Sequence, residues 1–88
     1  MTPYEMKQII LKNVPFAKLE KGKGVCEFYQ KNEKSLGISY EDVDGETDVY
    51  IYNIFVDSEY INISSRGTKD NPLPSEVLNE LTEEWNKY

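Results

Sequence analysis

The sequence contains no histidine, and its 88 residues include a single cysteine, Cys26. Histidine is the usual general base near neutral pH and the commonest metal ligand, so catalytic arrangements that need an imidazole are excluded. One cysteine cannot form an internal disulfide, which favours a reducing compartment. We expect Cys26 to be a small residue of the core or of an interface. The sequence therefore predicts a non-enzymatic protein without catalytic residues, metal ligands or cofactors.

Long hydrophobic runs are also absent. No stretch approaches the ~20 consecutive apolar residues that a membrane-spanning helix needs. The first residues have the pattern of an amphipathic helix and not of a secretory signal. Phosphate-binding and dinucleotide-binding glycine motifs are missing, and the acidic stretch around Gly45 does not match an EF-hand. We expect a cytoplasmic protein.

Positive charge is scarce in the second half of the chain. Residues 1–40 carry seven Lys and four Glu, whereas residues 41–88 carry three basic and twelve acidic residues. The net charge of −6 repels nucleic acids and anionic membranes, both of which bind proteins through Lys and Arg. A basic protein surface is the partner that this charge favours.

Periodicity predicts one α+β domain over residues 1–88. Thr2, Pro3 and Glu5 form a capping-box pattern at the start of a helix that ends near Pro15. Strand patterns follow at residues 24–30, 35–41, 47–56 and 60–64, and a last helix follows with Ser75 as its cap. Short connections favour a four-stranded antiparallel meander with both helices on one face of the sheet.

The dipeptide Asp44-Gly45 is typical of a two-residue type I′ hairpin turn between the second and third strands. That turn places Tyr40 opposite Val49 and Ile38 opposite Ile51. All four side chains then lie on the core face, as the hydrophobic pattern requires. The sequence thus predicts a complete register for the central hairpin.

Carboxylates gather around this turn, at Glu41, Asp42, Asp44, Glu46 and Asp48. The predicted register sets Glu41 directly opposite Asp48, and like charges in that position destabilise a sheet. One interpretation is solubility, since exposed carboxylates near a turn are well hydrated and screened by salt. The other is a binding tip for a cationic partner.

The third predicted strand is apolar on both faces. Its outer residues in the predicted register are Tyr50, Tyr52, Ile54 and Val56, and a three-residue turn adds Tyr60 to the same side. Two-sided apolarity is typical of a strand that is covered on both faces. Either residues 15–24 cover the tyrosines, or the tyrosines form an exposed patch that contacts a partner.

Charged residues outside the central hairpin form two further features. The last helix carries Glu76, Glu80, Glu83 and Glu84. They form a solvated helix face or extend the acidic surface. Arg66 is the only arginine, and we expect it to pair with a nearby carboxylate.

The leading hypothesis is an inhibitor whose acidic surface blocks a basic nucleic-acid-binding protein, such as a nuclease or a defence effector. Phage anti-defence factors of the anti-CRISPR and anti-restriction kinds use this nucleic-acid mimicry. The predicted partner-binding residues are Glu41, Asp42, Asp44, Glu46, Asp48, Tyr50, Tyr52 and Tyr60. The alternatives are an immunity protein against a nuclease toxin, a homodimeric accessory or assembly subunit, and an enzyme that relies on tyrosine, lysine and carboxylate side chains.

Overall fold

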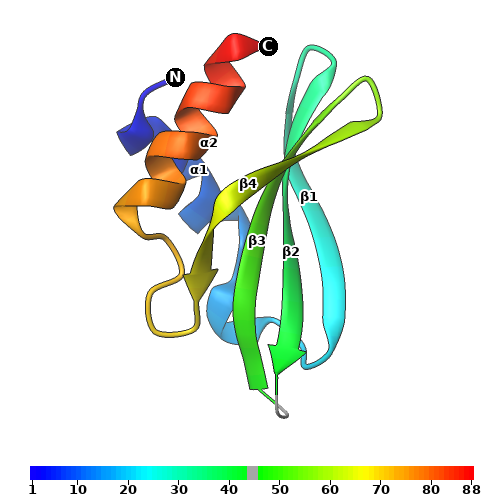
Figure 1. Cartoon of the computed structure of the whole chain (residues 1–88), viewed down its shortest axis with the longest axis vertical. Coiled ribbons are helices and arrows are strands. Elements are labelled where there is room, and N and C mark those ends of the chain that lie inside the picture. Colours follow the sequence, from blue (N-terminus) through cyan, green and yellow to red (C-terminus); the bar gives the residue numbers. More distant parts are fainter. Residues whose placement is uncertain (44–45) are drawn as a thin grey trace.

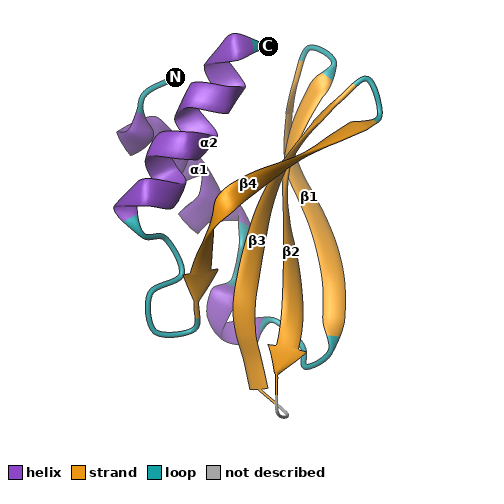
Figure 2. Cartoon of the chain, in the orientation of Figure 1, coloured by secondary structure: helices purple, strands orange, loops and turns teal. Residues whose placement is uncertain are grey.

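The computed structural model describes residues 1–43 and 46–88, with only the backbone for residues 43, 46–48 and 64. The elements, in chain order, are α1 (Pro3–Asn13), η1 (Phe16–Lys18), β1 (Lys23–Lys31), β2 (Lys34–Val43), β3 (Glu46–Val56), β4 (Glu59–Thr68) and α2 (Ser75–Lys87). The four strands form one antiparallel sheet in sequence order (Figure 1). Both helices lie on the same side of that sheet (Figure 2). The predicted fold is confirmed.

Helix α1 begins where the capping pattern predicts. The Thr2 hydroxyl accepts a hydrogen bond from the Glu5 N–H at 3.2 Å and also lies 3.2 Å from the Glu5 carboxylate, to which it donates. Such a cap stabilises a helix by about 1 kcal/mol. The helix ends at Asn13 with Val14 as its C-cap, because a residue before proline disfavours the helical conformation.

Helix α2 begins at Ser75, and its N-cap position is Pro74, which supplies no side-chain hydrogen bond. The prediction that Ser75 caps this helix is therefore wrong by one residue. The apolar stripe of α2 packs on the sheet and on α1, and the buried core consists of Met6, Ile10, Val14, Leu36, Ile38, Tyr50, Tyr52, Ile54, Ile63, Val77, Leu78, Leu81 and Trp85. Complete burial of one such aliphatic side chain contributes about 1.5–3 kcal/mol.

The central hairpin follows its predicted register only near the turn. Asp42 pairs with Thr47, as a two-residue turn at residues 44–45 requires, although that turn itself lies outside the described residues. The register then shifts between Glu41 and Asp42, so that Glu41 pairs with Val49. This irregularity is a β-bulge, in which one strand contributes an extra residue.

The bulge reverses the predicted faces of β3. Ile38 pairs with Tyr52 instead of Ile51, and Tyr40 pairs with Tyr50 instead of Val49. Because side chains alternate along a strand, a shift of one residue moves every side chain of β3 to the opposite face. The predicted pairs beyond the bulge are therefore wrong, and the tyrosines of β3 face the helices.

Residues 15–24 do cover the tyrosine side of β3, but on the helix side of the sheet. The Phe16 ring packs edge-on against Tyr50, with a centroid distance of 5.0 Å and an interplanar angle of 68°. Leu19 is half-buried against the same core. This segment therefore extends the cover that α1 and α2 provide.

The opposite side of the sheet faces away from both helices (Figure 2), and we call it the open face. Its residues follow from strand pairing and alternation. They are Lys23, Val25, Glu27, Gln30, Ser35, Gly37, Ser39, Glu41, Val49, Ile51, Asn53, Phe55, Tyr60, Asn62, Arg66 and Thr68.

Candidate protein-binding surfaces

The structure describes the side chains of only two of the five carboxylates in the predicted binding tip, Glu41 and Asp42. Asp44 lies outside the described residues, as do the side chains of Glu46 and Asp48. The predicted cross-strand pair of Glu41 and Asp48 is wrong, because the bulge places Val49 opposite Glu41.

Glu41 has a cationic neighbour that the local sequence does not reveal. The Lys23 ammonium lies 3.4 Å from its carboxylate, since β1 pairs these two residues across the ladder. Surface ion pairs of this kind contribute about 0–1 kcal/mol to stability. The ion pair does, however, neutralise the charge of Glu41, which is one of the carboxylates of the predicted binding tip.

Asp42 is half-buried and lies beside the connection that precedes β1. Its backbone N–H donates to the Gly22 carbonyl at 2.7 Å. Its Oδ1 atom is buried and has no hydrogen-bond partner among the described residues. Asp42 is thus held against the body of the protein, which limits its exposure to a partner.

Tyr50 and Tyr52 are only 2% and 1% exposed, so their predicted place on an outer face is wrong. The Tyr52 hydroxyl donates to the carbonyl of Pro72, in the loop before α2. Burial raises the pKa of Tyr52 well above its usual value, with a further contribution from Tyr50. Both rings belong to the core, and neither can contact a partner of the folded protein.

Tyr60 lies on the open face and is 46% exposed. Its ring packs edge-on against Phe55 with a centroid distance of 5.0 Å, and its hydroxyl lies 3.4 Å from that of Ser39. A tyrosine held in this way presents a fixed apolar ring with a polar tip, which suits an interface. Its contact with a partner stays a prediction.

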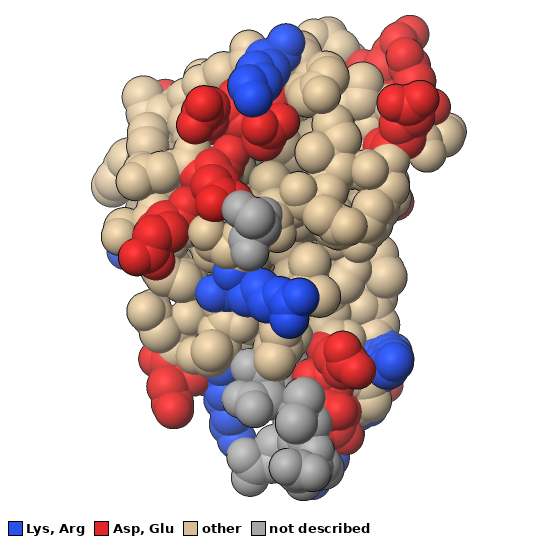
Figure 3. Space-filling view, viewed as in Figure 1, with Lys and Arg blue, Asp and Glu red and all other residues tan. Residues whose placement is uncertain are grey.

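The four glutamates of α2 form a row that we call the acidic strip, Glu76, Glu80, Glu83 and Glu84. Figure 3 shows acidic side chains running along α2 on one side of the molecule. Glu80 is held in place by β4, because the Ser65 N–H and hydroxyl donate to its carboxylate at 3.3 and 2.8 Å. Glu84 lies 2.8 Å from the Lys87 ammonium and raises the pKa of that lysine. Glu76 and Glu83 are exposed.

A groove of about 260 Å³ separates the acidic strip from β4. Ile61, Asn62 and Ile63 line one side, and Glu80, Glu83 and Glu84 line the other. An apolar wall beside carboxylates suits a lysine or arginine side chain, which combines an aliphatic stem with a charged head. The sequence places the glutamates on one helix, but no local pattern in it indicates that the isoleucines of β4 border that helix.

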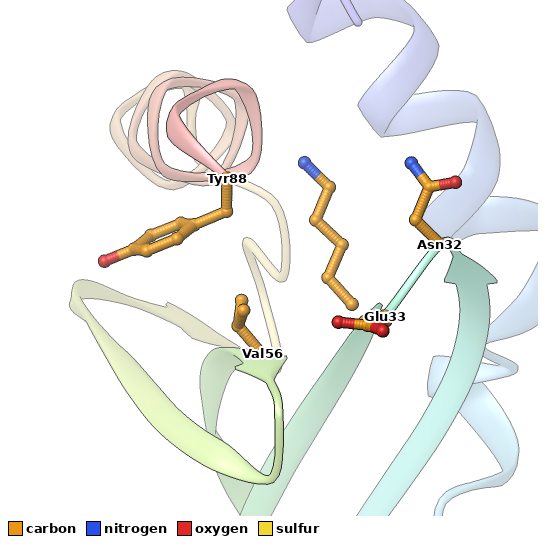
Figure 4. Close-up of a pocket in the computed structure, with 5 residues that line it drawn as sticks. Asn32, Glu33, Val56 and Tyr88 are labelled. Carbon is orange, nitrogen blue, oxygen red and sulfur yellow. The ribbon is translucent and has the colours of Figure 1, made fainter.

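A larger pocket of about 510 Å³ lies between the β1–β2 turn and the end of α2. Figure 4 shows Tyr88 and Val56 on one side of it and Asn32 on the other. Lys34 also lines it, but the Lys34 ammonium donates to the Trp85 carbonyl and lies 4.3 Å from the centre of the Trp85 ring. Burial, and to a lesser degree Lys31, lower the pKa of Lys34. The Lys34 ammonium is therefore bound to the C-terminal end of α2 and is not free to bind a ligand in this pocket.

Among the described residues, no three or more carboxylate, thiol or imidazole groups are arranged to hold a metal ion. None of the helices in the described part of the chain is long and apolar enough to span a membrane. The chain matches no known protein family, no curated protein and no solved structure. The functional proposal therefore depends on the surfaces of this chain alone.

Proposed function

We propose that this protein is a non-enzymatic, cytoplasmic inhibitor that binds a basic, nucleic-acid-binding protein through the acidic strip. The observation that carries the proposal is the row of α2 glutamates beside the groove at β4 (Figure 3). We place the main contact at this row because, in the hairpin tip, Glu41 is paired with Lys23 and Asp42 is half-buried. Contacts of Asp44, Glu46 and Asp48 with a partner stay a prediction.

The spacing of the strip suits a phosphate-binding partner. Side chains three or four residues apart lie about 5–6 Å apart on a helix surface, so neighbouring carboxylates can engage neighbouring lysines or arginines. Proteins that bind nucleic acids carry such basic residues in clusters. Glu80 contributes a preorganised carboxylate, because Ser65 already holds it in one orientation.

Phage anti-defence factors and immunity proteins against nucleases both use acidic surfaces in this way. We favour an anti-defence factor of the anti-CRISPR or anti-restriction kind, in which the carboxylates take the place of phosphates. An immunity protein would use the same contacts, and the identity of the captured target distinguishes the two.

Affinity capture from a lysate of the source cells tests the proposal. The bait is the wild-type chain, and the test variant is Glu76→Lys/Glu83→Lys, which reverses two exposed charges of the strip. We expect the wild type to retain a basic nucleic-acid-binding protein, and we expect added double-stranded DNA or high salt to release it. The test variant should lose at least about tenfold in affinity, or about 1.4 kcal/mol.

The matched control is Glu33→Lys/Glu59→Lys, which changes the net charge equally at two exposed positions outside the acidic strip, one in the β1–β2 turn and one at the start of β4. Capture should survive in this control. The proposal fails if the wild type retains no basic nucleic-acid-binding protein. It also fails if both variants lose binding to the same extent, because bulk charge would then explain the interaction.

A further inference from the structure

The open face carries large apolar side chains that no described element covers. Val25 is 60% exposed and Tyr60 is 46% exposed, while Ile51 and Phe55 are half-buried between them. Two hollows of about 380 and 340 Å³ indent this side of the sheet, one beside Val25 and Ile51 and the other beside Phe55. The open face therefore has exposed apolar side chains, Val25 and Tyr60, next to two hollows that a second surface can fill.

The strands of the open face are balanced in charge, although the whole chain carries a net charge of −6. Their charged side chains on this face are Lys23, Arg66, Glu27 and Glu41, two of each sign, and Glu33 of the β1–β2 turn adds one carboxylate at the hollow beside Phe55. A basic protein surface gains little Coulomb attraction from such a face. The open face suits a partner whose contact surface is also apolar and also carries equal numbers of positive and negative charges.

The two charges of the open face that form no ion pair among the described residues lie on opposite edge strands. Glu27 belongs to β1 and Arg66 to β4, and both are exposed. Neither side chain forms an ion pair within the part of the chain that the structure describes. The carboxylate partner that we predicted for Arg66 is therefore not found there. A two-fold axis that sets β1 of one copy over β4 of another pairs these charges twice, because residues i and j meet reciprocally in such interfaces.

A buried acceptor also remains unsatisfied on this face. Asn53 is fully buried, and its amide donates to the Ser39 hydroxyl at 2.9 Å and to the Ile51 carbonyl at 3.3 Å. Its Oδ1 atom has no partner among the described residues. Buried polar atoms are usually hydrogen-bonded, so the network beneath the open face is incomplete among the described residues.

From these observations we infer that the open face binds a second copy of the chain, forming a two-sheet sandwich. Two sheets pack face to face about 10 Å apart with their strands within about 30° of each other. Glu27 of one copy pairs with Arg66 of the other. Phe55 and Tyr60 of one copy enter the hollow beside Phe55 of the other copy. The acidic strips of both copies stay outside the contact.

The size of the face is sufficient for such a contact. Four strands at about 4.8 Å spacing, each of about nine residues at about 3.3 Å, cover about 600 Å² in projection. A standard interface buries about 800 Å² of accessible surface on each partner. The accessible surface of the open face exceeds its projected area, because side chains protrude from the sheet. The polar residues of the face make this a dimer of modest affinity.

Light scattering across a concentration series tests the dimer. The wild type should double its mass between about 1 μM and about 500 μM, the range in which dimers of modest affinity form. Val25→Asp should stay monomeric throughout, because it buries an unpaired carboxylate at the contact. The matched control is Leu11→Asp, at an apolar residue of α1 that is 49% exposed and lies away from the open face, and it should dimerise normally. A wild type that is monomeric at every concentration overturns the inference.

A charge-swap cycle tests the paired residues. Glu27→Arg and Arg66→Glu should each weaken the dimer at least tenfold, because each sets two like charges against each other. The double variant should restore wild-type dimerisation, since both pairs re-form with exchanged signs. Failure of the double variant to recover overturns the proposed arrangement.

Salt dependence separates this inference from the proposed function. The dimer should persist at about 1 M salt, where the Debye length falls to about 3 Å and capture by the acidic strip is lost. The variant Glu76→Lys/Glu83→Lys should dimerise like the wild type. A monomeric wild type would leave the acidic strip proposal untouched, and a lack of captured partner would leave the dimer untouched.

Discussion

At the scale of single residues, the hydroxyl of Tyr52 links the sheet to the loop before α2. It donates to the carbonyl of Pro72, and the same carbonyl lies against Gly67 of β4. A side chain at Gly67 would overlap the Pro72 carbonyl, so only glycine allows this approach. The contact therefore depends on two residues that are fifteen positions apart in the sequence.

Gly67→Ala should destabilise the fold by about 1–3 kcal/mol, because its methyl group displaces Pro72 and breaks the hydrogen bond from Tyr52. Urea denaturation measures the change in the free energy of unfolding. Asn62→Ala, at an exposed residue of the same strand, is the control and should stay within about 0.5 kcal/mol of the wild type. Equal stability of the two variants would contradict this role for Gly67.

The raised pKa of Tyr52 predicts a loss of stability in alkali. Unfolded tyrosine ionises near pH 10, whereas the buried hydroxyl stays protonated in the folded chain. Its contribution is fully present below pH 10 and is lost as the pH rises above that value, at up to about 1.4 kcal/mol per pH unit. Unfolding measured between about pH 8 and 11 should show this decline in the wild type and a smaller decline in Tyr52→Phe. Identical profiles would contradict the assignment.

At the scale of elements, Lys34 connects the start of β2 with the end of α2. Its ammonium donates to the Trp85 carbonyl and lies over the Trp85 ring, so one side chain satisfies a helix-end carbonyl and forms a cation–π contact. Tyr29 adds a ring contact to Trp85, with centroids 5.6 Å apart. These contacts explain why the β1–β2 hairpin and α2 stay together although the sequence separates them.

Lys34→Met should destabilise the protein by about 1–3 kcal/mol, because the Trp85 carbonyl loses a charge-assisted hydrogen bond while the apolar volume is largely kept. Lys31→Met is the matched control, since Lys31 is exposed on the neighbouring strand. Thermal unfolding followed by circular dichroism compares the two variants. A control as unstable as Lys34→Met would show that the loss of any lysine in this hairpin is responsible.

At the scale of the whole molecule, charge and apolar surface lie on different parts of the fold. The acidic strip lies on α2, whereas the balanced open face lies on the side of the sheet away from both helices (Figures 2 and 3). This separation makes the two proposed interactions, with a basic protein and with a second copy, compatible in one chain. Salt should weaken the first interaction and spare the second.

Prediction from the sequence was most successful where local chemistry decides the outcome. The capping box at Thr2 and the helix end before Pro15 follow from short-range sterics and hydrogen bonds. The pairing of Asp42 with Thr47 follows from the turn dipeptide. The candidate site was predicted less well, because the cation beside Glu41 and the groove beside α2 come from residues distant in the sequence.

The sequence by itself determined the order of the elements, the antiparallel topology and the sign of the net charge. Only the tertiary structure decided which face of β3 enters the core. Residues of both parities on β3 are apolar, so the hydrophobic pattern is compatible with either face. The bulge beside Glu41 and the contact of Tyr52 with Pro72 select one of them. Because strand faces alternate at every residue, that single irregularity buries Tyr50 and Tyr52 and leaves Ile51 and Phe55 on the open face.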